Sequence, residues 1–352
     1  MDHLNSIPNL IFVGLSKRKK EQDPAESKTT SFEEMKLPYE EFRKIGGWFT
    51  SEDVVVQTGS EDGDSLSLFN VLTGEMKEIF KTDAYILSVA ISPKDQKIIF
   101  QQVKDSASTL ICINAEGKQL EELPIDANGY VSLDWNKEDP SQVFTSYYED
   151  EEQLKLLHWN MSENKVEERE TTSLYPVWYS ENLYLYVDNK EDYSLETGQL
   201  YMGDVRSKDP VLINDQVADF FLHEDTFITF TSSDFNKEEL LLTYQYPFMV
   251  ENGFLTIPKV TMNGRVTFPY LTQAGRDTLV YGIFAKEPVE MEKETGEFQF
   301  GYLDFNKKEV VSVTDVPDDA PVQLSPNGKY SLYGWRSEYL IDIESGTVHS
   351  LL

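Results

Sequence analysis

The stretch SPNGKYSLYGW, Ser325 to Trp335, opens with a Ser-Pro turn, passes through polar residues and runs into an apolar strand. The stretch SPKDQKIIFQQ, Ser92 to Gln102, shows the same order of features more than two hundred residues earlier. Proline presets the backbone of such a turn, and the polar residues after it favour solvent. The same short sequence pattern at two distant places indicates that the chain is built from similar units.

The repeated unit is a large apolar residue that closes one strand, then a short polar turn, then a second apolar strand. It occurs at steps of 43, 44, 43, 44, 49 and 53 residues. The seven apolar anchors are Trp48, Ile91, Trp135, Trp178, Leu222, Leu271 and Leu324. A fixed period of this length is typical of propellers and solenoids. The two long steps predict insertions around residues 247–264 and 287–297.

A second pair of strands follows each anchor, and several pairs have a glycine in the central turn, in Thr73-Gly74, Glu116-Gly117 and Ser345-Gly346. Glycine supplies the positive φ that such hairpins require. One unit is therefore four short strands in about 44 residues, which is the size of a β-propeller blade. We predict an all-β fold, a β-propeller of four-stranded blades. The repeat count gives seven blades, and six is the alternative if one long step is not a full blade.

The last unit contains four strands by Leu352, so we expect the ring to close by packing of blade on blade, without an N-terminal strand in the last blade. Residues 31–352 are predicted to form the propeller. Residues 1–30 are charged and lack periodicity, and we expect a flexible N-terminal tail there. The apolar run Leu10 to Leu15 is too short to cross a bilayer, and basic residues follow it where a signal peptide would have them in front.

The tryptophans are candidates for packing or for ligand contact. Trp48, Trp135 and Trp178 share the anchor position, so we expect them to pack between blades. Trp335 follows the second strand of the last blade and does not share that position. Packing between blades is expected there too, with an aromatic platform for a ligand as the alternative.

The chain has 62 acidic and 31 basic residues, which gives a net charge of −31. Nucleic-acid binding needs a basic stripe that neutralises phosphates, and the one basic run, Lys17 to Lys20, lies in the predicted tail. We therefore expect no nucleic-acid partner. We also expect no transmembrane span, and a monomer.

Residues of known catalytic or metal chemistry are sparse. Cys112 lies in an apolar run and is expected to be a small buried hydrophobe. The four histidines are scattered singly, without the spacing of a zinc site. The nucleophile elbow, the P-loop and the dinucleotide fingerprint are absent. An enzyme stays open, because a propeller can bring catalytic residues from several blades to one axial pocket.

Carboxylates recur in the loops that join the second and third strands of several units. These loops share one face of a propeller, so they predict an acidic rim that holds a hard cation such as Ca²⁺ or docks a cationic partner. The rim residues are Glu61, Asp62, Asp64, Glu149, Asp150, Glu151, Glu152, Asp188, Glu191 and Asp192, with Asp234 and Glu238 in the next loop. Solvated surface is the other interpretation in a chain this acidic. No cofactor is expected, and Ca²⁺ is the one candidate ion.

The segments KIGGWFTSEDVVVQ, Lys44 to Gln57, and YPVWYSENLYLYV, Tyr175 to Val187, resemble the YqgU-like family of Bacillus lipoproteins. The resemblance runs from about Ser31 to the C-terminus. It implies a β-propeller, of six blades by the family label, on the outer face of the cytoplasmic membrane. It also implies a lipidated Cys as tether and no known enzymatic role. This chain departs from the lipoprotein pattern because no Cys precedes Cys112.

The leading hypothesis is a non-catalytic binding or interaction propeller of a Gram-positive cell envelope, outside the cytoplasm, with an unknown protein or envelope ligand as partner. One alternative is a hydrolase or lyase that acts on glycan at an axial active site. Another is a propeller held by structural Ca²⁺. Converging Asp, Glu, His or Arg side chains in an axial pocket favour the enzyme, and a plugged or smooth axis favours the interaction module.

Overall fold

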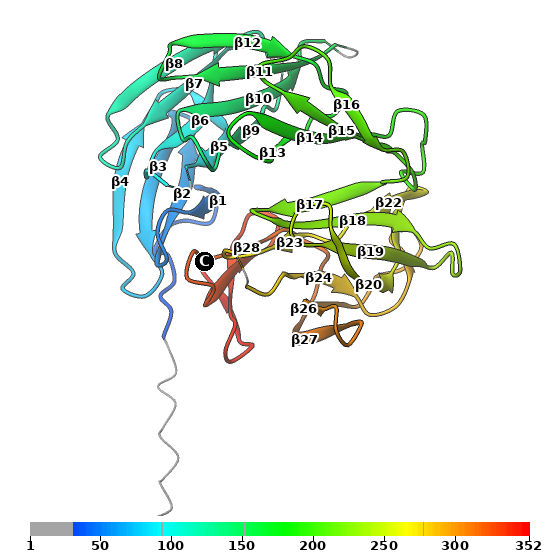
Figure 1. The fold of residues 1–352 in the computed structure, drawn as a ribbon. Coiled ribbons are helices and arrows are strands. Elements are labelled where there is room, and N and C mark those ends of the chain that lie inside the picture. Colours follow the sequence, from blue (N-terminus) through cyan, green and yellow to red (C-terminus); the bar gives the residue numbers. More distant parts are fainter. Residues whose placement is uncertain (1–30, 93, 128, 151–152, 277) are drawn as a thin grey trace, which may run out of the picture. The chain divides into compact units, whose positions relative to one another are not determined.

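The computed structural model describes residues 31–92, 94–127, 129–150, 153–276 and 278–352 (Figure 1). Its regular elements are 31 β-strands. The predicted tail, residues 1–30, lies outside the described residues. Residues Phe32–Leu352 group together as one unit, to which the following description refers.

Seven sheets have four antiparallel strands each, and we number them sheets 1 to 7 in chain order. Sheet 1 consists of β1 (Phe42–Trp48), β2 (Asp53–Ser60), β3 (Gly63–Asn70) and β4 (Met76–Lys81). Sheet 2 consists of β5 (Tyr85–Ile91), β6 (Ile98–Lys104), β7 (Ala107–Ile113) and β8 (Gln119–Ile125). Sheet 3 consists of β9 (Ser132–Trp135), β10 (Gln142–Tyr148), β11 (Leu154–Asn160) and β12 (Lys165–Arg169). Sheet 4 consists of β13 (Val177–Trp178), β14 (Leu183–Asp188), β15 (Gln199–Asp204) and β16 (Val211–Asn214).

The remaining sheets follow the same plan with one insertion. Sheet 5 consists of β17 (Asp219–His223), β18 (Thr226–Ser232), β19 (Glu239–Gln245) and β20 (Glu251–Pro258). Sheet 6 consists of β23 (Leu271–Thr272), β24 (Tyr281–Ala285), β26 (Phe298–Asp304) and β27 (Glu309–Val316). Sheet 7 consists of β28 (Val322–Leu324), β29 (Tyr330–Tyr333), β30 (Tyr339–Asp342) and β31 (Val348–Ser350). An additional three-stranded sheet joins β21 (Val260–Met262), β22 (Arg265–Thr267) and β25 (Val289–Glu290).

The three-stranded sheet accounts for the long sequence steps. Strands β21 and β25 lie in the two regions where insertions were predicted, β22 follows directly after the first region, and β21 pairs with β25 in parallel. All seven anchor residues fall in the first strands of the four-stranded sheets. The Gly residues of the predicted hairpins, Gly74, Gly117 and Gly346, have φ of 72°, 79° and 68°. The period, the anchors and the hairpin turns are thus confirmed.

Burial falls from the second strand of each sheet to the fourth. Strand β10 is buried at every residue except Tyr148, and β6 begins with four buried residues. The fourth strands β4, β12 and β16 are mostly exposed. A second strand therefore needs apolar residues on both sides of its pleat, because a neighbouring sheet covers each face. The first strands of neighbouring sheets contact one another, as β1 with β5, β5 with β9, and β23 with β28.

The hydrophobic core is divided into clusters between successive sheets. Sheets 1 and 2 share a cluster that includes Val55 and Phe100, and sheets 3 and 4 share one that includes Phe144 and Trp178. Corresponding clusters join sheets 2 and 3, 4 and 5, 5 and 6, and 6 and 7. Each sheet is thus held by the packing of its two faces, which is the arrangement of a β-propeller.

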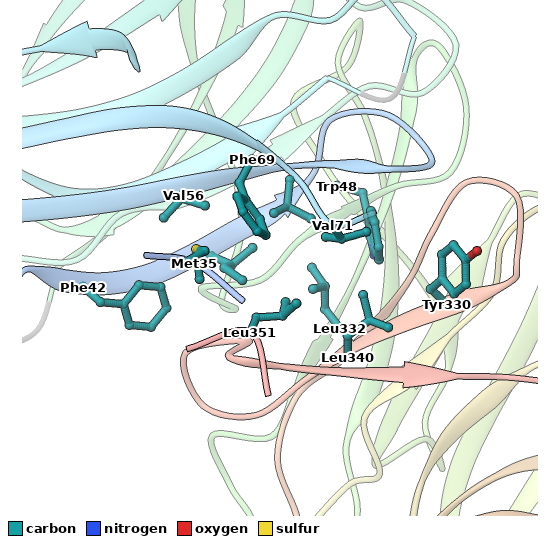
Figure 2. Packing of buried hydrophobic residues seen from close by; sticks show 12 residues of the cluster. Met35, Phe42, Trp48, Val56, Phe69, Val71, Tyr330, Leu332, Leu340 and Leu351 are labelled. Atoms are coloured by element: carbon teal, nitrogen blue, oxygen red, sulfur yellow. The ribbon is translucent and has the colours of Figure 1, made fainter. Parts of the chain in front are cut away.

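The first and last sheets also share a cluster, which Figure 2 shows. Trp48, Val56 and Phe69 of the first sheet and its flanks face Leu332, Leu340 and Leu351 from the last. The amide of Met35 donates to the carbonyl of Leu351 at 2.8 Å. Sheet 7 has its own four strands, so the ring closes without a strand exchanged between its ends, as predicted.

Polar side chains join each of the first four sheets to the first strand of the next sheet or to the residues just before that strand. Gln57 Nε2 donates to the Ile86 carbonyl at 2.7 Å, and Gln101 Nε2 donates to the Gly129 carbonyl at 2.7 Å. Ser146 Oγ donates to the Leu174 carbonyl at 2.8 Å, and Asn189 Nδ2 donates to the Ala218 carbonyl at 2.8 Å. Each bond joins a side chain of one sheet to the backbone at the start of the next.

The two Ser-Pro turns are equivalent. The amide of Ser325 donates to the Tyr330 carbonyl at 2.8 Å, and the amide of Ser92 donates to the Lys97 carbonyl at 2.8 Å. In the turn that begins at Ser325, Gly328 has a φ of 69°. Both turns join the first and second strands of a sheet, so both lie at the end of the ring where the first strands stop.

Candidate ligand-binding site

Turns between first and second strands surround a cavity of about 400 Å³, which we call the axial pocket. It lies where the first strands end, and five different sheets contribute to its wall. The residues used below are Lys94 of sheet 2, Asn136 and Lys137 of sheet 3, Tyr179 of sheet 4, His223 of sheet 5 and Arg276 of sheet 6. Lys94 belongs to the SPKDQK turn, one of the two Ser-Pro turns described above.

A lysine and a histidine meet in this pocket. Lys137 Nζ lies 3.3 Å from His223 Nδ1. Burial lowers the pKa of Lys137, although the charges of Asp134 and Glu224 act in the opposite direction. Burial and then the neighbouring Lys137 lower the pKa of His223 to about 4. At neutral pH His223 is therefore uncharged, and its Nδ1 accepts a hydrogen bond from the Lys137 ammonium.

Two acidic residues of the pocket wall, Glu224 and Asp225, share a cationic partner, whereas the exposed Glu138 is not part of this pairing. Arg276 bridges sheets 5 and 6, with Nε 3.5 Å from Glu224 and a terminal nitrogen 3.0 Å from Asp225. All three side chains are partly exposed, so the ion pairs position the two turns more than they stabilise the fold.

Hydrogen bonds fix the remaining turns against one another. Asn136 Nδ2 donates to the Ser180 carbonyl at 3.1 Å and to the Glu181 carbonyl at 3.0 Å, which joins sheets 3 and 4. Lys94 Nζ donates to the Glu138 carbonyl at 3.4 Å, which joins sheets 2 and 3. The ring of Tyr179 stacks on Phe248 of sheet 5, with centroids 4.0 Å apart. The pocket wall is thus held in place before any ligand arrives.

Two aspartates with raised pKa values lie on first strands of sheets whose turns line this pocket. Burial raises the pKa of Asp134, on β9, to about 6, although the amide of Trp178 donates to its carboxylate at 3.0 Å. Burial also raises the pKa of Asp219, on β17, to about 6. The Phe220 amide donates to it at 2.8 Å.

The predicted acidic rim lies at the other end of the sheets. In an antiparallel sheet successive turns alternate between the two ends, so second-to-third turns cannot share an end with the axial pocket. Glu61, Asp62 and Glu191 are exposed. Glu149 pairs with Lys155 at 2.6 Å, and Asp188 accepts from the Lys190 amide at 3.0 Å. Asp150 accepts from the Gln153 amide at 2.8 Å, and Glu151 and Glu152 lie outside the described residues.

Asp192 organises its own loop. Its carboxylate accepts hydrogen bonds from the amides and hydroxyls of Ser194 and Thr197, and these bonds lower its pKa to about 2. Within the part of the chain that the structure describes, the rim carboxylates form no group of three that could hold a metal ion.

The prediction that Asp64 belongs to an exposed rim is wrong. Strand β3 starts at Gly63, so Asp64 is already in the sheet and is 3% exposed. It accepts hydrogen bonds from Gln57 Nε2 at 3.0 Å and from the Ile86 amide at 2.8 Å. Asp64 therefore belongs to the tie between sheets 1 and 2.

The aromatic and cysteine predictions have mixed outcomes. Trp48, Trp135 and Trp178 are buried between sheets, as expected. Trp335 is 66% exposed and contacts Tyr270 edge to face, so the expectation that it packs between blades is wrong. Cys112 is buried, and burial raises its thiol pKa to about 12, which makes it the inert small hydrophobe that was expected.

Lys137 and His223, from sheets 3 and 5, were not predicted from the sequence to be site residues. The available signal was positional: each of these side chains follows a first-strand anchor. A comparison of the turns at equivalent positions of the repeat would have identified these residues together.

Comparison with known proteins places the fold in a family. The class is a β-propeller: a crystal structure of an uncharacterized protein from Listeria monocytogenes EGD-e superposes with a TM-score of 0.81 at 19% identity, over 91% of this chain and 97% of that one. The β-propeller domain of the Trilobed protease from Pyrococcus furiosus, described as having an open velcro topology, gives a TM-score of 0.52 at 15% identity, over 88% and 97%. An oligogalacturonate lyase from Vibrio parahaemolyticus gives 0.52 at 11% identity, over 84% and 88%.

Residues 70–334 match the family described as "YqgU-like 6-bladed beta propeller domain", and the chain belongs to this family. The uncharacterized lipoprotein YqgU of Bacillus subtilis strain 168 is 24% identical over 316 residues, which cover 87% of this chain and 83% of that protein. Among the described residues no helix is long and apolar enough to span a membrane.

Proposed function

We propose that this protein is a non-catalytic binding propeller whose ligand enters the axial pocket. The observation that carries the proposal is the convergence of turns from five sheets on one cavity of about 400 Å³. Sites built from several loops on a rigid scaffold are typical of ligand recognition. The bonds of Asn136 to two carbonyls of sheet 4 support a preformed wall, which lowers the entropy lost on binding.

A variant that fills the pocket tests this proposal. Ala274 lines the pocket, so Ala274→Trp places a large side chain inside it. Leu212→Trp puts the same bulk on strand β16, where Leu212 is 47% exposed. The probe is a soluble digest of cell-wall peptidoglycan, and the readout is the melting temperature, which a ligand of the folded state raises. We expect a rise for the wild type and Leu212→Trp and none for Ala274→Trp. Equal rises in all three proteins would refute an axial site.

We propose an extracytoplasmic, membrane-associated location. The support is the similarity to a protein that is itself described as a lipoprotein. Protease added to intact cells that express the full chain should digest it, whereas a cytoplasmic marker protein stays intact. Protection of the chain until the cells are lysed would contradict the proposal.

We also propose that the ring has seven blades. Seven four-stranded sheets and seven clusters between them, including the one between first and last, support this number over the six of the family description. Residues 70–334 enclose β4 to β29, which make up five complete four-stranded sheets, the three-stranded sheet, and parts of sheets 1 and 7. We regard the three-stranded sheet as an insertion and not as a blade. A crystal structure in which that sheet packs between sheets 5 and 6 around the axis would contradict this number.

A second candidate function is a hydrolase or lyase that acts on glycan at the same pocket. Lys137 and His223 favour it, because two basic groups with lowered pKa values in contact are suited to proton abstraction. Incubation with solubilised polysaccharides, followed by measurement of new reducing ends, tests it. Product release by the wild type that His223→Asn abolishes would replace the binding proposal with this one.

A further inference from the structure

The chemistry of the axial pocket also indicates the kind of group that it binds. Lys137 has one described polar contact at its ammonium, His223 Nδ1 at 3.3 Å. An ammonium has three N–H donors and no acceptor capacity. Two donors of Lys137 therefore have no partner among the described residues.

The charge of Lys137 is also uncompensated at short range. Within the described residues no carboxylate oxygen lies within 4.0 Å of Lys137 Nζ, the distance needed for an ion pair. Glu224 and Asp225 are engaged by Arg276. Asp134 acts on Lys137 through its charge but makes no ion pair with it, and it accepts from the Trp178 amide instead. A mostly buried cation without a carboxylate in direct contact costs free energy that an anionic ligand group would recover.

The surroundings of Lys137 match an organic anion. Lys94 adds a second cation to the pocket wall, with its ammonium on a backbone carbonyl and not on a carboxylate. Tyr179 and the edge of the buried Trp178 also line the pocket. The net charge of −31 opposes the approach of an anion, but at physiological salt charges are screened over about 8 Å. The local amines therefore decide binding inside the pocket.

We infer that the axial pocket binds its ligand through an anionic group, a carboxylate or a phosphate, which accepts hydrogen bonds from the Lys137 ammonium. This inference rests on the proposed function, since it concerns the same pocket. Because His223 shares the ammonium, an anion bound there also changes the surroundings of the imidazole. The two sources of the anion, an acidic sugar or a phosphate ester, share this chemistry.

The imidazole of His223 provides the readout, by NMR at pH 7 with its signal assigned from His223→Asn. The probes are glucuronate, inorganic phosphate and, as the uncharged match for glucuronate, glucose. We expect at least one of the anions to shift the His223 signal saturably and glucose to leave it in place. Glucuronate alone would indicate a sugar carboxylate, and phosphate alone would indicate a phosphate ester. No shift with either anion would overturn the inference.

Variants of Lys137 connect the shift to this side chain. Lys137→Met should weaken anion binding roughly 10- to 100-fold, the value of a hydrogen bond to a charged group. Lys137→Arg should retain binding, and Lys104→Met, at an exposed lysine paired with Asp83, should bind as the wild type does. If Lys137→Met does not fold by circular dichroism, Lys137→Gln replaces it. Unchanged affinity in a folded neutral variant would refute the role of Lys137.

The two proposals can fail separately. If Ala274→Trp abolishes the response to the cell-wall digest while neither anion shifts His223, the pocket binds a ligand and the anionic inference is wrong. If the digest raises the melting temperature of Ala274→Trp as it does that of the wild type, and the anions also leave the His223 signal unchanged, both proposals are wrong.

Discussion

Trp178 is bound to Asp134 of the preceding sheet by two hydrogen bonds. Its indole Nε1 donates to the Asp134 carbonyl at 3.1 Å, and its amide donates to the Asp134 carboxylate at 3.0 Å. Trp48 repeats the first of these bonds where the ring closes, with Nε1 2.9 Å from the Gln323 carbonyl. Trp135 has the same position in sheet 3, but its Nε1 has no partner among the described residues.

This difference separates packing from hydrogen bonding. Trp178→Phe and Trp135→Phe remove similar volumes from buried sites, but only the first leaves a carbonyl without its donor. We expect Trp178→Phe to lower the free energy of unfolding by about 1–2 kcal/mol more than Trp135→Phe does. Urea unfolding measures both values. Equal losses in the two variants would show that the indole bond adds nothing to the packing.

The pH dependence of stability should carry the signature of Asp134. Its pKa is about 6 in the folded protein, against about 3.9 for an unfolded chain. Between these values the folded state holds a proton that the unfolded state has released, so the free energy of unfolding falls as the pH rises through this window. Asp134→Asn removes the charge and keeps an oxygen for the Trp178 amide. We expect it to be more stable than the wild type at pH 8, on the order of 1–3 kcal/mol, and equal to it near pH 4.

Asp192 provides the control of opposite sign. Its lowered pKa, about 2, means that its carboxylate stabilises the fold above about pH 4 and loses this effect as the pH falls toward 2. Asp192→Asn should therefore melt below the wild type at pH 7. Melting curves of both Asn variants across pH 4 to 8 distinguish the two signs. A lower melting temperature for Asp134→Asn at pH 8 would contradict the effect of burial on Asp134.

The packing between the first and last sheets should contribute as much to stability as the packing between other neighbouring sheets. Leu351 is fully buried in the cluster of Figure 2. We expect Leu351→Ala to lower the free energy of unfolding by about 2–5 kcal/mol. The half-exposed Leu212 makes the matched change, and Leu212→Ala should stay within about 0.5 kcal/mol of the wild type. A small effect of Leu351→Ala would show that the ring does not depend on this contact.

The acidic rim should not respond to calcium. Its described carboxylates are divided among the loops of different sheets and several are engaged locally, as Glu149 is by Lys155. We expect EDTA-treated protein to melt at the same temperature with and without millimolar Ca²⁺ at fixed ionic strength. A rise of several degrees would mean that the folded state binds the ion, and Glu149→Gln together with Asp150→Asn would then show whether this loop holds it.

The fold was predictable because its signals are local and repeated. Anchors such as Trp48 and Trp178, and hairpin glycines such as Gly117, each report one turn or one strand end. Their period then reports how the strands are grouped. The sequence could not show that Asp64 is buried, because this depends on a strand that begins at Gly63, two residues earlier than the loop pattern indicates.

The candidate site was not predictable in the same way. Lys137 and His223 are 86 residues apart, and they meet because sheets 3 and 5 direct their turns toward one axis. No spacing rule contains that information, since it depends on the rotation between sheets. Charge counting instead drew attention to the most acidic loops, which lie at the opposite end of the sheets. A feature shared by all blades, the polar turn after each anchor, was the better guide.

Sheets 1 to 5 and sheet 7 are each an uninterrupted segment of the chain, and this has a consequence for biosynthesis. As the polypeptide leaves the ribosome, sheet 1 can pair its four strands before sheet 2 exists, and each later sheet finds the face of its predecessor already formed. The exception is the contact of Met35 and Trp48 with the end of the chain. Until Leu351 is made, that apolar face of sheet 1 stays open to solvent, so the nascent protein is most exposed to aggregation at its oldest part.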